Sequence, residues 1–171
     1  QGADQFSLTV YRAELLRVVG QAGRALASCK SALNMAKVDT ERCKAWIGMA
    51  AASRMLGQGE KTLGELAFAQ SVAEQEGLTE ELAEIFFYRG TIAFAAGQFE
   101  DCLQLQTQSL RHARQAGSHK WEATAEGGLG DAQYACGRMR LALEHFNHCL
   151  ALCQEYSFLD IQARNQFMRG V

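Results

Sequence analysis

Apolar and small residues recur every three or four positions along the chain, a spacing that predicts amphipathic helices. Glycines interrupt this pattern, and a leucine stands six residues after each of four of them. The intervals between these four glycines are 37, 40 and 40 residues. A recurrence of this length predicts a stack of similar helical hairpins, each with a turn at the glycine. The turn glycines are Gly20, Gly57, Gly97 and Gly137.

The second helix of each predicted hairpin carries two small residues one helical turn apart, twelve and sixteen positions after the turn glycine. Small side chains at this spacing form a stripe that another helix can approach closely. Each first helix has a small residue seven positions before the turn, and two copies have a large aromatic anchor, Trp46 or Phe86, eleven positions before it. The small pairs are Ala32 and Ala36, Ala69 and Ala73, Ser109 and Ala113, and Cys149 and Cys153.

The pattern predicts an all-α chain with nine helices in one domain over residues 1–171. First helices are expected near 5–19, 40–56, 79–96 and 119–136, their partners near 22–37, 59–75, 99–115 and 139–155, and a ninth helix from Leu159. The repeats then cover about 5–38, 39–77, 78–117 and 118–157, with a partial repeat at 158–171. Because Gly170 stands forty residues after Gly130, we expect a piece of a longer array, whose last helix has an uncovered apolar strip through which it can self-associate.

The order of aromatic anchor, small residue, turn glycine and paired small residues resembles the tetratricopeptide repeat. The resemblance implies a right-handed α-solenoid of antiparallel hairpins, here with about four repeats and part of a fifth. The period near 40 exceeds the usual 34 of the family, and Gly77, Gly117 or Ser157 replaces the proline that usually ends a repeat. Long hairpins of this kind are similar to those of bacterial signalling and regulatory proteins and of animal spindle-orientation scaffolds, and the run GLGDAQYACGRMRLALEHF most resembles the bacterial signalling tails. The matching residues are Trp46, Ala50 and Gly57, then Phe86, Gly90, Phe94 and Gly97, then Leu129, Gly130, Tyr134, Gly137 and Ala142.

Composition supports a helical, water-exposed domain. The 171 residues include no proline, 48% are hydrophobic and 21% are charged, so little interrupts helices and a sizeable core can form. The formal charge of −2 gives no field that attracts nucleic acid or an anionic membrane. No apolar run approaches the roughly 18 residues that span a bilayer. We therefore expect a cytoplasmic protein that contacts neither nucleic acid nor membrane.

No catalytic or cofactor motif stands out. The stretch GQGEKTLGE lacks the glycine that a phosphate loop needs directly before Lys61. His145, His148, Cys149 and Cys153 could offer four metal ligands, but both cysteines occupy the small core positions. We therefore expect no enzyme, no cofactor and no metal. Two glycines of the run EGGLGDA fall inside a predicted helix without a packing role, and room for the backbone of a bound ligand is one explanation.

The remaining function is binding, because the first helices of stacked hairpins line a concave surface. Mixed charges and aromatic rings on this surface suit a peptide or a partner helix. We expect an interaction scaffold, in the setting of a bacterial signalling or transcriptional regulator. The alternative is a sensor of a small ligand or peptide that changes solenoid curvature on binding. The predicted contact residues are Arg17, Lys44, Arg54, Glu84, Phe87, Tyr88, Thr91, Asp131 and Tyr134.

Overall fold

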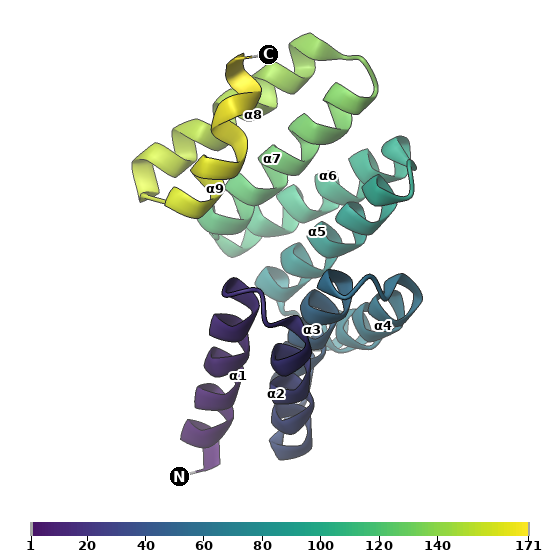
Figure 1. The fold of residues 1–171 in the computed structure, drawn as a ribbon, viewed down its shortest axis with the longest axis vertical. Coiled ribbons are helices and arrows are strands. Elements are labelled where there is room, and N and C mark those ends of the chain that lie inside the picture. The colour runs from purple at the N-terminus through teal and green to yellow at the C-terminus, as the bar shows by residue number, and fades with distance from the viewer. Residues whose placement is uncertain (1, 171) are drawn as a thin grey trace. The chain divides into compact units, whose positions relative to one another are not determined.

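The chain is almost entirely helical in the computed structural model, which describes residues 2–170. Nine α-helices and a closing 3-10 helix follow one another, and this part of the chain contains no strand (Figure 1). The all-α prediction is confirmed, and the helix limits agree closely with those expected. The elements are α1 (Gly2–Val18), α2 (Ala22–Met35), α3 (Asp39–Met55), α4 (Gly59–Glu76), α5 (Thr79–Ala95), α6 (Phe99–Ala116), α7 (His119–Ala135), α8 (Met139–Tyr156), α9 (Leu159–Asn165) and η1 (Gln166–Gly170).

The turn inside each hairpin is made by a glycine with a left-handed backbone. The four turn glycines have φ between 71° and 77°, a conformation that a residue without Cβ adopts at little cost. The N–H of the next residue then donates to a carbonyl of the last helical turn, as from Gln58 to Ser53 at 3.0 Å and from Gln98 to Ala93 at 2.9 Å. This arrangement satisfies carbonyl groups that the helix end leaves free. In the stretch GQGEKTLGE, Gly57 thus forms the turn after α3 and Gly59 starts α4.

The second helices end in the same way, with one exception. Gly77 and Gly117 follow α4 and α6 with φ of 66°. Ser157 follows α8 with φ of 59°, and among the described residues it alone has a positive φ without being glycine. Gly77, Gly117 and Ser157 stand where the repeat that the sequence resembles usually ends in a proline.

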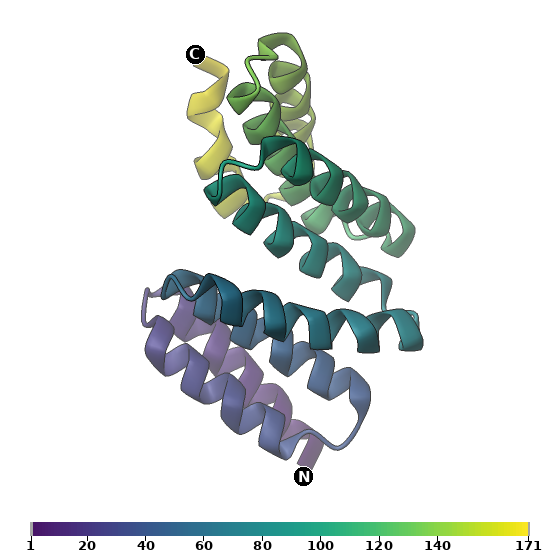
Figure 2. The same ribbon diagram turned by 90° about the vertical axis from the view of Figure 1, so that its right-hand side faces the viewer.

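The helices form two compact units, Gln1–Glu81 and Leu82–Val171. In the first unit α2 packs against α1 and α3, and α3 packs against α4. In the second unit α6 packs against α7, α7 against α8, and α8 against α9 and η1. Within each unit, consecutive helices lie side by side as antiparallel pairs (Figure 2).

The small pairs predicted on the second helices are buried. Seven of the eight residues are fully inaccessible to solvent, and Ala36 is half-buried. The close approach that they permit allows polar contacts between helices, because Ser109 Oγ donates to the Ala83 carbonyl at 2.7 Å. The leucines six residues after the turn are less uniform, since Leu63 and Leu143 are 43% and 46% exposed.

Glycines inside α7 make room for side chains of neighbouring helices. A Cβ at Gly127 would lie 2.8 Å from Asn165 Oδ1 of α9, and a Cβ at Gly128 would lie 2.6 Å from Gln106 Cδ of α6. Both neighbouring side chains are buried, at 8% and 1% exposed. The suggestion that these glycines admit a ligand backbone is therefore wrong, because the protein's own amide side chains fill the space. A Cβ at Gly130 would lie 2.5 Å from the Phe146 ring.

Candidate functional site

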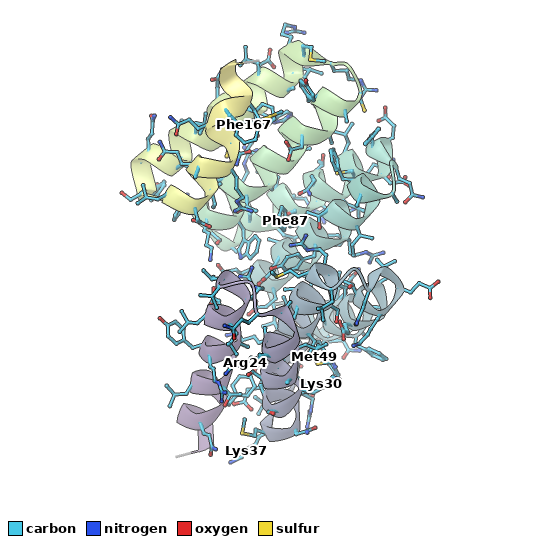
Figure 3. All side chains as sticks on the ribbon, viewed as in Figure 1. Arg24, Lys30, Lys37, Met49, Phe87 and Phe167 are labelled. Atoms are coloured by element: carbon cyan, nitrogen blue, oxygen red, sulfur yellow. The ribbon has the colours of Figure 1, made fainter. Side chains whose placement is uncertain are left out.

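An aromatic cluster connects α5 and α7 in the second unit. The ring centroids of Phe87 and Trp121 are 5.7 Å apart, and the Tyr88 ring lies edge-on to Trp121 at 6.3 Å. Tyr88 is only 4% exposed, whereas Phe87 and Trp121 are half-buried; Figure 3 shows Phe87 on α5. Two accessible rings backed by a buried one offer rigid apolar contact area of the kind that anchors protein partners.

A carboxyl group lies on the same side of α7, ten residues after Trp121. Trp121, Thr124, Gly128 and Asp131 are spaced by three, four and three residues, so they share one face of the helix. Surrounding protein atoms raise the pKa of Asp131 to about 6, and the positive charge of Arg164 on α9 acts in the opposite direction. A carboxyl group that titrates near neutral pH is typical of functional sites. We call the surface formed by Phe87, Trp121 and Asp131 the aromatic face.

Six of the nine predicted contact residues belong to the second unit. Phe87 and Asp131 lie on the aromatic face, and Tyr88 supports it from a buried position. Glu84 and Thr91 are half-buried on α5, and the Thr91 hydroxyl donates to the Tyr88 carbonyl at 2.8 Å. Tyr134 near the end of α7 is 39% exposed. These residues are Glu84, Phe87, Tyr88, Thr91, Asp131 and Tyr134.

The other three predicted residues lie in the first unit. Arg17 is half-buried near the end of α1, and Arg54 is exposed in the last turn of α3. Lys44 is exposed on α3, with its Nζ 3.9 Å from Glu81 Oε1. Their role in binding stays a prediction.

Two residues of this region were missed by sequence reasoning. Trp121 stands forty residues after Glu81, and Arg164 stands eighty residues after Glu84. The repeat register that selected Glu84 could have found Arg164, because it places Arg164 at the same position two repeats later. Trp121 lies in a polar first turn, HKWEA, where it does not continue the apolar pattern.

The histidines and cysteines of α8 separate into two environments. Cys149 and Cys153 are buried with Ala123 and Ile161, and burial raises the pKa of both thiols. His145 instead contacts Glu126 of α7, with 2.7 Å between Nδ1 and Oε2. In residues 2–170 no three His, Cys, Asp or Glu side chains are grouped so that they could hold a metal ion. No helix of this part of the chain is long and apolar enough to cross a membrane.

The repeated hairpins define a helical-repeat protein with a half-buried aromatic surface on its first helices. Residues 81–155 match the model of the tetratricopeptide repeat family. This part of the chain is therefore similar to tetratricopeptide repeats. Repeats of this family generally mediate protein–protein interactions, and the family is typically a non-enzymatic scaffold.

Two solved structures share the fold at low sequence identity. BtubC (BKLC) from P. vanneervenii is 19% identical with a TM-score of 0.71, over 90% of this chain and 64% of BtubC. The nearly identical TPR-like repeats of a Podospora anserina protein assigned as a kinesin light chain are 17% identical with a TM-score of 0.66, over 97% of this chain and 87% of theirs. The chain thus spans less than two thirds of BtubC. No curated protein matches the sequence.

Proposed function

We propose that the aromatic face binds a segment of a partner protein, so that the chain serves as an interaction scaffold. The observation that carries the proposal is the pair of half-buried rings, Phe87 and Trp121, held 5.7 Å apart by two different helices. Rings fixed in this way lose little conformational entropy when a partner packs on them. The long hairpins favour a setting in a cytoplasmic bacterial signalling or transcriptional regulator.

The charged groups at the edge of the aromatic face set the partner's orientation. Asp131 offers a carboxyl group on α7, and Lys120 Nζ lies 5.9 Å from the centroid of the Trp121 ring. Charges at the rim of an interface contribute more to register and association rate than to affinity. The partner segment is therefore expected to place an apolar side chain on the rings and polar groups beside it.

The experiment selects twelve-residue peptides from a phage-displayed library on the wild-type chain and measures their affinity by tryptophan fluorescence. A Trp46→Phe background leaves Trp121 as the reporter. Phe87→Ala should weaken binding about tenfold or more, because central aromatic anchors carry most of the binding energy. Circular dichroism verifies that the variant keeps its helices.

The matched control is Phe68→Ala, which removes a 63% exposed ring from α4 in the first unit. This variant should bind the selected peptides with unchanged affinity. Equal affinity of the wild type and Phe87→Ala for every selected peptide contradicts the proposal. A change in the radius of gyration on peptide binding would support the sensor alternative over a rigid scaffold.

A further inference from the structure

α1 has apolar residues on two opposite faces. Phe6 and Ala13 are 5% and 3% exposed and pack in the core of the first unit. On the other side Leu8, Tyr11 and Leu15 are 68%, 59% and 49% exposed. Their spacing of three and four residues makes one continuous stripe. A helix that packs on a core from one side needs only one apolar face. The exposed stripe of Leu8, Tyr11 and Leu15 therefore requires an explanation.

The repeat register shows what covers this stripe elsewhere. The residues of α3 that stand 37 positions after Leu8 and Leu15 are Ala45 and Ala52, with 1% and 0% exposed. Ala45 packs with Ala32 of α2, and Ala52 packs in the cluster that includes Cys29 of the same helix. The second helix of the preceding hairpin therefore covers this face of α3.

The same arrangement recurs in α7. Ala125 and Ala132 occupy the register positions of Leu8 and Leu15 and are fully buried. They pack in a cluster with Cys102 of α6, again the second helix of the preceding hairpin. The exposed stripe of α1 is thus the face that a preceding second helix covers in both units.

The side chains of α1 limit which kind of helix could cover the stripe. Tyr11 stands where α3 has Gly48, whose Cβ would lie 2.8 Å from Cys29 Sγ. A helix over α1 must therefore leave space for a ring. Arg12 stands where α3 has Met49, which is 9% exposed. A guanidinium enclosed at this position needs an acidic partner, because an unpaired buried charge is costly.

α5 carries nearly the same four residues at the equivalent positions of the repeat. Ile85, Tyr88, Arg89 and Ile92 stand 77 positions after Leu8, Tyr11, Arg12 and Leu15. Ile85 and Tyr88 are 0% and 4% exposed. The outer stripe of α1 thus has nearly the same composition as a face of α5 on which Ile85 and Tyr88 are buried.

We propose that this stripe is the docking surface for the second helix of a further tetratricopeptide hairpin that precedes α1 in the same polypeptide. This helix has small side chains facing Tyr11 and an Asp or Glu facing Arg12. It joins α1 through a short loop, as α2 (ending at Met35) joins α3 (starting at Asp39).

A second copy of the chain fits the stripe less well. Two-fold antiparallel pairing of α1 with itself about the middle of the stripe brings Arg12 next to Arg12, and Glu14 next to Glu14, of the other copy. Like charges at such close range oppose association. The stripe occupies the same repeat positions as the faces that α3 and α7 pack against α2 and α6. This equivalence favours the second helix of a preceding hairpin as the occupant.

The test compares Leu15→Glu in the natural full-length polypeptide and in residues 1–171, using hydrogen exchange of the α1 amides. We expect exchange in α1 of the full-length protein to accelerate at least tenfold, because the charge is forced into a buried contact. In residues 1–171 the same substitution should change the exchange rate of the α1 amides by less than about twofold. Leu143→Glu, at a residue of similar exposure on α8 (46%), is the matched control and should have no effect on α1 in either protein.

Three results would overturn the proposal. The first is the same small effect of Leu15→Glu in both proteins. The second is a natural polypeptide in which no helical hairpin precedes α1. The third is a dimer of residues 1–171, detected by light scattering, that Leu15→Glu dissociates, because the occupant would then be a second copy.

Discussion

α3 in the first unit and α7 in the second occupy the same place in the repeat, yet their anchors are chemically opposite. In α3 the anchor is Trp46, whose ring stacks on Phe68 of α4 with centroids 5.6 Å apart. Eighty residues later α7 has Glu126, which is only 2% exposed. Arg114 Nη2 donates to its Oε1 at 3.1 Å, and His145 Nδ1 lies 2.7 Å from its Oε2. One position therefore accepts either an aromatic stack or an ion-pair network.

The partners of the two anchors explain how both solutions work. His148 stands eighty residues after Phe68, and its Nδ1 lies 4.0 Å from Glu126 Oε1. A buried carboxylate is tolerated only when it is paired, and here the partners come from α6 and α8. The network thus links three helices, whereas the stack links two. The repeat register determines the position of the anchor residue but not whether that residue is aromatic or acidic.

The largest expected effect concerns the residue four positions after the anchor. α3 has Ala50 there, and α7 has Gly130, against which the Phe146 ring packs. Gly130→Ala should lower the free energy of unfolding by about 2–3 kcal/mol, because the added methyl group would lie 2.5 Å from a ring that is only 1% exposed and would overpack the core. Urea unfolding followed by circular dichroism measures the change.

Two further variants sharpen this prediction. Phe146→Leu copies Leu66, which stands eighty residues earlier, and in combination with Gly130→Ala it should recover most of the lost stability. Gly23→Ala adds a methyl group in α2 where no atom lies within 4 Å, and it should stabilise by up to about 1 kcal/mol. Equal effects of Gly130→Ala and Gly23→Ala would refute the packing argument.

The second prediction tests the ion-pair anchor. Glu126→Ala should lower the free energy of unfolding by about 2 kcal/mol, because it removes the acceptor shared by Arg114 and His145 and leaves a cavity. Glu126→Phe, which restores the aromatic type of Trp46, should cost less, since apolar residues can replace a buried ion pair. Urea unfolding again gives both values. An alanine variant as stable as the wild type would show that the network contributes nothing.

Periodicity predicted the architecture because it reports backbone geometry directly. Turn glycines and small pairs have to recur wherever helices reverse or approach closely, so the nine helices and the buried pairs could be read from the sequence. The anchor of α7 could not be predicted, because Glu126 breaks the apolar pattern and its partners come from helices distant in sequence. Asn165 and Gln106 were missed for the same reason. Their side chains pack against glycines of a neighbouring helix, but in the sequence such polar residues look like surface residues.

The candidate site was predicted in part. The repeat register identifies the helix face that holds Phe87 and Asp131, because that face depends only on helix geometry. It does not reveal which side chain along the face is covered. Tyr88 is buried although it was expected to contact a partner, and Trp121 provides the accessible ring in its place. Side-chain packing between α5 and α7 determines which of these rings is accessible, and that packing cannot be read from a single sequence.

The smallest expected effect concerns Asp131, which occupies the place of the buried Ala51 of α3 (3% exposed). Its pKa is raised from the usual value near 3.8 to about 6. Between these two pH values the folded chain binds more protons than the unfolded chain, so this carboxyl group makes stability fall as pH rises from about 4 to 6. Asp131→Asn should remove that contribution.

The size of this pH effect is limited by solvent. Asp131 remains exposed at the surface, so water screens its charge and the expected difference is only about half a kcal/mol. Urea unfolding of the wild type and Asp131→Asn at pH 4.5 and pH 7.5 isolates it, because all other titrating groups are common to both proteins. The variant should gain stability relative to the wild type at pH 7.5 and not at pH 4.5. The same difference at both pH values would mean that Asp131 titrates like an ordinary surface carboxylate, and α3 and α7 would then be alike in their electrostatics at this position.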